Sequence, residues 1–396
     1  MGTQTTVQSV LILEDHDFQR SLASALLKDC GVSHIVGACD GEESLSILRE
    51  QSIQVVLCDL QTPGMDGVSL LRHIAQEGLA DAVIIASAMD IALICTVEEM
   101  ARSCGLQVLG AVEKPLTRQK LSEMLARFRP RAAQSEPRAL EMMGIDDIRT
   151  GLARDEMLPY FQPKVSLSTR RCTGVEALVR WKHPQRGLIP PLAFIPVAEG
   201  TPAIHDLTWM MAHKAITAMR SWERTAWPLS LSLNFSADVL CTNGVVERMT
   251  DAATRYAIEP ANLVLEVTES VIGRDTTQLL ETLARLRLRG FGLSIDDFGT
   301  GYSSMQQLSR ISFTELKIDR SFVRGAASRS HLRTILEGSL TLARNLRLKS
   351  VAEGVETQED WDLLRDLGCD EAQGYFIAKP MPSDAFLDWH ASWTRG

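Results

Sequence analysis

Eight short strand patterns follow one another between residues 145 and 392, and most of them are followed by a helical pattern. They cover residues 158–165, 172–181, 229–235, 262–267, 291–296, 313–319, 348–353 and 371–377. A block of about 250 residues with this alternation is typical of a (β/α)8 barrel, whose site lies at the C-terminal ends of the strands. The sequence therefore predicts a TIM-like (β/α)8 barrel for residues 145–392.

The polar residues of these strands fall on one phase of the two-residue alternation. In residues 229–235 the leucines occupy one face, and Ser230, Ser232 and Asn234 occupy the other. The leucine face suits packing on outer helices, so we expect the polar face to line the barrel mouth. This inward set comprises Gln162, Glu176, Arg180, Asn234, Glu266, Asp296, Lys317, Asp319, Glu353 and Gln373.

Each inward residue also has an ordinary structural explanation. Glu176 and Arg180 are four residues apart and would form a simple surface ion pair if their segment were helical. Asn234 would suit a turn, and Lys317 a solvated charge. The occurrence of such residues on consecutive strands favours a shared site.

Asp296 and Asp297 are adjacent at the end of one strand pattern. Adjacent side chains on a regular strand point to opposite faces, so the two carboxylates share a site only if the strand ends between them. The glycines at 299 and 301 permit such a loop. Neighbouring carboxylates repel unless a cation lies between them, which predicts a metal site; the alternative is a plain surface turn.

Residues 8–128 show a second alternation of strands and helices. The strand patterns cover residues 10–13, 34–39, 54–60, 82–88 and 108–113, which predicts a doubly wound parallel sheet. Such sheets place their sites at the C-terminal ends of the strands. Glu14, Asp15, Asp59, Ser87 and Lys114 fall at those ends, and three carboxylates there would suit one Mg²⁺. The Pro- and Arg-containing residues 129–144 are predicted to be a linker.

Composition excludes several other classes of protein. The net charge of -9 over 396 residues disfavours binding to a nucleic acid polymer, which needs a basic surface. Eight cysteines without a CxxC pair, and no secretory signal, predict reduced thiols in a cytoplasmic protein. The most apolar run, residues 82–97, contains Asp90 and is shorter than the roughly 20 residues of a membrane span.

The first domain resembles the receiver domain of bacterial two-component response regulators. The resemblance rests on the acidic pocket and on the turn of residues 59–67. It implies that Asp59 accepts a phosphoryl group from a cognate histidine kinase, and that the Mg²⁺ is held by Glu14, Asp15, Asp59 and the Gln61 carbonyl. Ser87 and Lys114 would contact the phosphoryl oxygens. Ala111 departs from the family, which usually has an aromatic residue there. In the family that aromatic residue is coupled to the Ser87 position and helps to transmit phosphorylation, and Ala111 lacks the ring for this role. An inactive receiver used only for docking is the alternative.

The second domain resembles the EAL phosphodiesterases, which hydrolyse cyclic di-GMP. The motif of residues 176–181 (EALVRW) carries the resemblance, together with residues 162–164, 194–199, 266–269, 317–319, 352–356 and 373–375. The resemblance implies two Mg²⁺ or Mn²⁺ ions. Their ligands would be Glu176, Asn234, Glu266, Asp296, Asp297 and Glu353.

The same resemblance implies further roles. Glu353 would be the general base, Lys317 would orient the attacking water, and Asp319 would fix Lys317. Glu269 would anchor the loop of residues 296–304. Substrate contacts would come from Gln162, Arg180, Asp319, Glu356 and Gln373.

The expected function is a response regulator that converts cyclic di-GMP to linear pGpG, with activity controlled by phosphorylation and a homodimer or larger assembly. Two alternatives remain at this stage: a receptor that binds cyclic di-GMP without hydrolysing it, and a docking protein for a kinase or another regulator. Intact metal ligands and a general base favour the enzyme.

Overall fold

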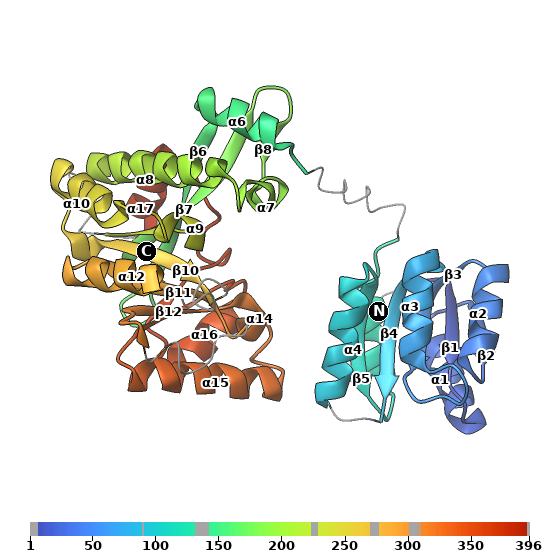
Figure 1. Cartoon of the computed structure of the whole chain (residues 1–396). Helices are drawn as coiled ribbons and strands as arrows, with labels where there is room; N and C mark the ends of the chain where they lie inside the picture. Colours follow the sequence, from blue (N-terminus) through green and yellow to red (C-terminus); the bar gives the residue numbers. More distant parts are fainter. Residues whose placement is uncertain are drawn as a thin grey trace. The chain divides into compact units, whose positions relative to one another are not determined.

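The computed structural model describes residues 7–88, 91–130, 142–222, 229–269, 277–300, 308 and 310–393. Most of the predicted linker and residues 301–304 of the predicted site loop lie outside the described residues. The chain divides into two compact units, Met1–Ala139 and Leu140–Gly396 (Figure 1).

The first unit contains a five-stranded parallel sheet in the order β2-β1-β3-β4-β5. Its strands are β1 (Ser9–Leu13), β2 (His34–Ala38), β3 (Ile53–Asp59), β4 (Ala80–Ser87) and β5 (Gln107–Glu113). The helices are α1 (Asp17–Asp29), α2 (Gly41–Glu50), α3 (Gly67–Glu77), α4 (Ile91–Ser103) and α5 (Arg118–Leu125). Each face of the sheet carries its own apolar core, because Leu11 and Leu13 point to one face while Val10 and Ile12 point to the other. The predicted doubly wound fold is confirmed.

The second unit is a closed barrel of eight strands in the order β6-β14-β13-β12-β11-β10-β9-β7, with β7 pairing back to β6. The strands are β6 (Met157–Ser166), β7 (Cys172–His183), β9 (Ser230–Asn234), β10 (Leu263–Thr268), β11 (Gly292–Phe298), β12 (Glu315–Ile318), β13 (Lys349–Ala352) and β14 (Glu371–Ala372). A short strand, β8 (Gly187–Ile189), extends β7 as a hairpin.

The predicted barrel is confirmed, with two features that the strand patterns did not reveal. Strand β6 runs antiparallel to both of its neighbours, β7 and β14. Strand β14 covers only the first two residues of its predicted segment, and turns follow it. A Cβ on Gly374 in these turns would lie 2.2 Å from the Val355 carbonyl oxygen, so glycine allows the two backbones to approach closely.

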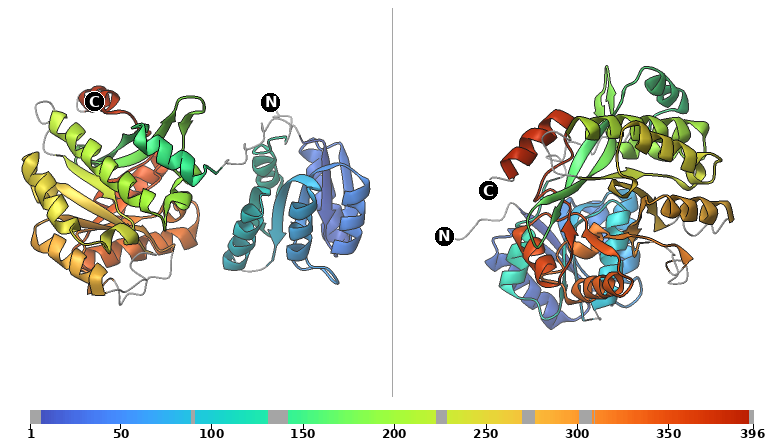
Figure 2. Two further views of the ribbon diagram at one scale, coloured as in Figure 1. Left: turned by 45° about the horizontal axis from the view of Figure 1, so that its top comes forward. Right: turned by 90° about the vertical axis from the view of Figure 1, so that its left-hand side faces the viewer.

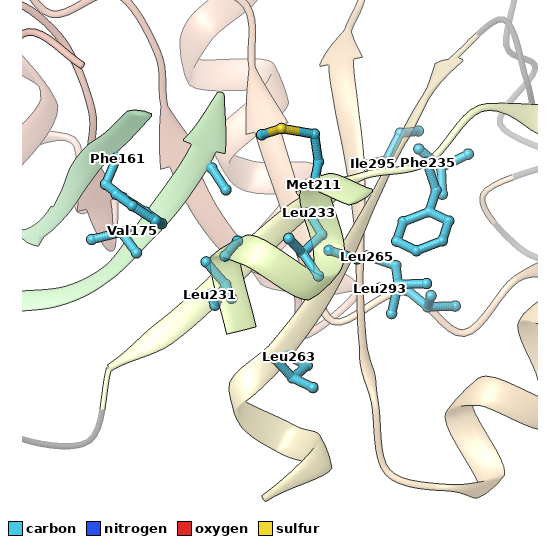
Figure 3. Packing of buried hydrophobic residues seen from close by; sticks show 14 of the residues in the cluster. Phe161, Val175, Met211, Leu231, Leu233, Phe235, Leu263, Leu265, Leu293 and Ile295 are labelled. Carbon is cyan, nitrogen blue, oxygen red and sulfur yellow. The ribbon is translucent and has the colours of Figure 1, made fainter. Parts of the chain in front are cut away.

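Helices cover the outside of the barrel (Figure 2). They are α6 (Ile145–Ala153), α7 (Ile195–Ala198), α8 (Pro202–Trp222), α9 (Ala237–Leu240), α10 (Val245–Arg255), α12 (Thr277–Leu288), α14 (Arg320–Val323), α15 (Ser330–Asn345), α16 (Gln358–Asp366) and α17 (Ser383–Trp393), with 3-10 turns at Pro191–Ala193 and Pro260–Asn262. Figure 3 shows Leu231, Leu233, Leu263, Leu265 and Leu293 on adjacent strands of this core. The leucine phase therefore faces the helices, as predicted, and the polar phase faces the barrel interior.

Within the described ranges, no helix combines the length and the apolar character that a membrane span requires.

Gly67 offers a test of how the first unit is packed. A Cβ at this position would lie 2.1 Å from the Asp59 carbonyl oxygen and 2.9 Å from Cys58 Sγ, so Gly67→Ala forces β3 and α3 apart. We expect a loss of about 1–3 kcal/mol in the stability of this unit. All seven tryptophans lie in the second unit, so their fluorescence transition should stay unchanged while part of the circular-dichroism signal melts earlier. An unaltered circular-dichroism melt would contradict the prediction.

Candidate functional site

The Lys317 ammonium group lies inside the barrel among four carboxylates, which we call the carboxylate ring. The side chain of Lys317 is 1% exposed. Its Nζ lies 3.3 Å from Glu176, 3.0 Å from Glu266, 3.0 Å from Asp296 and 2.6 Å from Glu353. The carboxylates come from β7, β10, β11 and the residue after β13, so barrel closure brings together groups that are far apart in sequence.

Three amide side chains form a hydrogen-bonded network around Glu176 of the ring. Gln373 Nε2 donates to Glu176 Oε2 at 2.6 Å and to Gln162 Oε1 at 3.1 Å, while Asn234 Nδ2 donates to Glu176 Oε1 at 3.0 Å. Gln162 Nε2 in turn donates to the Ala378 carbonyl at 3.1 Å. With its nitrogen turned to Glu176, the Asn234 oxygen is available for another partner.

The carboxylates of the pocket carry more negative charge than Lys317 can balance. Burial disfavours the charge on Glu176, but Lys317 and the amide hydrogen bonds outweigh it and lower the pKa of Glu176 to about 2. Burial and repulsion from Glu176 raise the pKa of Glu266 well above its ordinary value. Burial, opposed by Lys317 and aided by Asp296, raises the pKa of Glu353 to about 8. Such a pocket favours cations, which relieve this repulsion.

Two further observations fit the pocket to a hard divalent cation. Oxygen atoms of Asp296, Asp297 and Glu353 lie within 4.8 Å of one another. Glu266 Oε1 is buried and has no hydrogen-bond partner within the part of the chain that the structure describes. Oxygen donors of this kind are the preferred ligands of Mg²⁺ and Mn²⁺.

Asp296 and Asp297 reach one site by a route that differs from the prediction. The expectation that the strand ends between them is wrong, because β11 continues to Phe298. Its pairing with β12 instead shifts register between Ile295 and Phe298, and Asp297 takes a left-handed conformation with φ 54°. This irregularity turns both side chains toward the site. Burial and the neighbouring Asp296 raise the pKa of Asp297 to about 6.

Glu269 lies beside this irregular segment. Its side chain is buried, and Oε2 accepts a hydrogen bond from the Gly299 N–H at 3.0 Å. Gly299 has φ 96°, and a Cβ there would lie 2.7 Å from the Phe322 ring. This hydrogen bond joins Glu269 to the start of the loop, and the anchoring role that the family resemblance implies for Glu269 stays a prediction.

The remaining predicted contacts lie around the rim. Arg180 is half-buried, donates to the Val179 carbonyl at 2.8 Å and lies 5.9 Å from the Tyr160 ring centroid. Glu356 pairs with Arg324 at 3.0 Å. Asp319 does not form the expected ion pair with Lys317 among the described residues; its carboxylate caps α14 by accepting from the Ser321 N–H at 2.8 Å.

A cleft of about 760 Å³ opens beside the ring. Glu176, Asn234, Glu266 and Asp296 line its polar end, and residues of α8 line its apolar side. A polar end and an apolar wall are typical of a small-molecule site.

Sequence reasoning missed a second polar layer beneath the ring. Lys164 is buried and pairs with Glu315, and Glu371 pairs with Lys349 at 3.0 Å. These residues share the inward phase with Gln162, Lys317 and Gln373, so the same alternation could have identified them.

The predicted pocket of the first unit is also assembled. Lys114 Nζ lies 2.6 Å from Glu14 Oε2 and pairs with Asp59 Oδ2, while the Gln61 N–H donates to Asp59 Oδ1 at 3.1 Å. Carboxylate oxygens of Glu14, Asp15 and Asp59 lie within 4.8 Å of one another. Ser87 is buried at the end of β4, and Ala111 is partly buried in β5.

The fold and the two acidic pockets define a class of two-domain protein. A doubly wound unit precedes a barrel of the kind used by metal-dependent enzymes, and each unit carries an acidic pocket. Comparison with family models narrows this class. Residues 10–126 match the response regulator receiver domain, and residues 145–380 match the EAL domain. The chain belongs to the EAL domain family.

One curated relative is similar over nearly the whole chain, and others match part of it. The cyclic di-GMP phosphodiesterase RocR of Pseudomonas aeruginosa is 34% identical over 96% of this chain and 98% of its own length. The phosphodiesterase PA2567 of the same organism is 38% identical, but the chain spans only 45% of it. Among solved structures, the MucR phosphodiesterase with cyclic di-GMP is 41% identical with a TM-score of 0.58, covering 61% of this chain and 98% of that one.

Removal of the Glu269 carboxylate should loosen the Asp297 segment without deleting a predicted cation ligand. We expect Glu269→Ala to weaken Mn²⁺ binding by roughly 10-fold or more, since partners that orient ligands commonly have effects of this size. Calorimetric titration of the full chain measures it. Glu269→Gln is the matched control, because its amide oxygen can still accept from Gly299. Equal affinity in wild type and Glu269→Ala would count against the anchor.

Proposed function

We propose that this protein is a response regulator whose barrel hydrolyses cyclic di-GMP to linear pGpG by two-metal catalysis, under the control of its receiver domain. The observation that carries the proposal is the ring of four carboxylates around the buried Lys317, beside a cleft of about 760 Å³. Full-length similarity to a named cyclic di-GMP phosphodiesterase supports the choice of substrate.

Two divalent cations, Mg²⁺ or Mn²⁺, would supply Lewis acidity toward the phosphodiester and make water a better nucleophile. Glu176, Asn234, Glu266 and Asp296 would hold one of them. Asp296 would be shared with the second, which Asp297 and Glu353 would also hold, in keeping with the oxygen cluster of these three residues.

The protein's own groups then position and move protons. Glu353, which contacts Lys317 at 2.6 Å, would accept the proton of the attacking water as general base. Lys317, 2.6 Å from Glu353, would orient that water and offset charge on the phosphoryl oxygens. Water would attack phosphorus as its proton passes to Glu353, the bond to the leaving ribose oxygen would break, and that oxygen would take up a proton from solvent to give the open dinucleotide pGpG.

Substrate contacts would come from the rim. Arg180 would bind a phosphate, and Gln162, Asp319, Glu356 and Gln373 would contact other polar groups of the dinucleotide. Because the Asp319 carboxylate already caps α14, its contact would be made with its remaining oxygen. Two alternative functions are a non-hydrolysing receptor and a docking protein. A turnover experiment, described below, distinguishes them from the enzyme.

In the first unit Asp59 would accept the phosphoryl group from a cognate histidine kinase. Glu14, Asp15, Asp59 and the Gln61 carbonyl would hold one Mg²⁺, while Ser87 and Lys114 would bind the phosphoryl oxygens. We propose functional boundaries at residues 8–128 and 145–392 with a linker at 129–144. A homodimer or larger assembly in the cytoplasm completes the proposal.

Turnover separates the enzyme from the two alternatives. Purified protein with Mn²⁺ should convert cyclic di-GMP to pGpG, detected by liquid chromatography, and Glu353→Gln should lower kcat by about 100-fold or more because the base is lost. Glu337→Gln, an exposed carboxylate on α15, is the control and should be fully active. A folded, Mn²⁺-supplied wild type that binds the dinucleotide and leaves it uncut would identify a receptor.

Regulation by the receiver requires a separate measurement. Phosphorylation adds charge and acceptor oxygens at Asp59, so a small-molecule phosphodonor should change the turnover of wild type and leave Asp59→Asn unaffected. Chromatographic rates for both proteins, with and without the donor, provide the comparison. Identical rates under all four conditions would remove the regulatory link while leaving the hydrolase intact.

A further inference from the structure

A second buried ion pair lies beneath the carboxylate ring, and the proposed reaction does not use it. Lys164 Nζ lies 3.1 Å from Glu315 Oε1 and 3.2 Å from Oε2, and it donates to Ser232 Oγ at 2.7 Å. The Lys164 side chain is 0% exposed and that of Glu315 is 4% exposed. TIM barrels usually fill this region with branched aliphatic side chains, so three interacting polar groups here require an explanation.

The three residues occupy positions directly below groups of the site. Ser232 is two residues before Asn234 on β9, and Glu315 is two residues before Lys317 on β12. Because β6 runs antiparallel to its neighbours, Lys164 lies deeper in the barrel than Gln162. Residues two apart on a strand share a face, so each member supports a site residue on its own strand.

Lys164 connects strands that do not pair with one another. In the sheet order, β6 is separated from β9 by β7 and from β12 by β14 and β13. The hydrogen bonds of Lys164 therefore cross the barrel interior and fix distances that backbone pairing sets only through intermediate strands. Burial opposes the charge on Lys164, but attraction from Glu315, Glu266 and Glu371 together outweighs it and raises the pKa of Lys164, so the amine is charged at neutral pH.

We propose that Lys164 is a positioning residue for the cation site, acting through its contacts with Ser232 and Glu315. This inference rests on the proposed function, because the site it positions is the proposed metal site. The Lys164 contacts hold β9 and β12 so that Asn234 and Lys317 meet the ring at the distances that cation binding needs. Lys164 itself touches neither substrate nor cation.

The test measures Mn²⁺ affinity by calorimetry on the full chain, at temperatures where each variant is folded by circular dichroism. Lys164→Met keeps the length of the side chain and removes its contacts; we expect Mn²⁺ binding about 10-fold weaker, as for other groups that orient metal ligands. Lys214→Met is the control. Lys214 is half-buried on α8 and pairs with Asp155 at 2.6 Å, and no residue of the proposed site or of the Lys164 contacts is among its partners, so affinity should stay unchanged.

Two further variants separate positioning from simple stabilisation. Lys164→Met/Glu315→Gln removes the unpaired buried charge, so it should recover thermal stability while Mn²⁺ affinity remains weak. If Lys164→Met fails to fold, Ser232→Ala keeps both charges and should weaken Mn²⁺ binding by a smaller factor in the same direction.

Three outcomes would overturn the inference. Wild-type affinity in Lys164→Met, or in Ser232→Ala where that variant must replace it, would leave the pair without a role at the site. Recovery of both stability and affinity in the double variant would show that the ion pair only stabilises the fold and does not position the cation site. A wild-type chain that binds no Mn²⁺ would overturn the proposed function, and the inference with it.

Discussion

The attraction between the Lys317 ammonium and four carboxylates is the interaction on which the barrel's site depends. Any one of these buried carboxylates would be costly alone, and together they would repel. Lys317 makes their convergence possible by lying between 2.6 and 3.3 Å from all four. Each carboxylate comes from a different strand or from the residue that follows it, so the site forms only when the barrel closes. The ion pairs of the site therefore contribute to the stability of the closed barrel.

One lysine nevertheless leaves the pocket with excess negative charge. Burial is the largest cause of the raised pKa values of Glu266, Asp297 and Glu353, and repulsion from neighbouring carboxylates adds to each of them. Bound cations would supply the missing positive charge, so the same shortage that helps to raise these pKa values favours the binding of divalent ions. Lys317 thus holds the carboxylates close enough to share one ligand, and it neutralises only part of their charge, so they can bind divalent cations.

Much of this arrangement could be predicted from the sequence because the two-residue period of a strand is local. The leucine phase of residues 229–235 and the polar phase ending at Asn234 give the inward face without any tertiary information. Successive strands then share one rim because parallel connections return the chain to the same end of the sheet. The pocket around Asp59 could be predicted for the same reason.

The features that escaped prediction depend on contacts across the fold. The antiparallel direction of β6 follows from its pairing with β7 and β14, and no local pattern specifies it. The left-handed Asp297 is held by its surroundings, since most non-glycine residues avoid that conformation at a cost of about 1 kcal/mol or more. Asp319 was assigned to Lys317 by the resemblance to the family, yet its position before α14 gives its carboxylate a partner in the Ser321 N–H.

The two acidic pockets solve one electrostatic problem in the same way. Lys114 pairs with Glu14 and Asp59, just as Lys317 pairs with Asp296 and Glu353, and in each pocket the same carboxylates belong to a cluster that could hold a cation. An arriving cation therefore competes with the amine for its carboxylates. A phosphoryl group brings new oxygens that the amine can contact instead, so cation and phosphate should favour each other's binding. In both pockets the lysine that pairs with the carboxylates would therefore also be able to stabilise negative charge on phosphoryl oxygens.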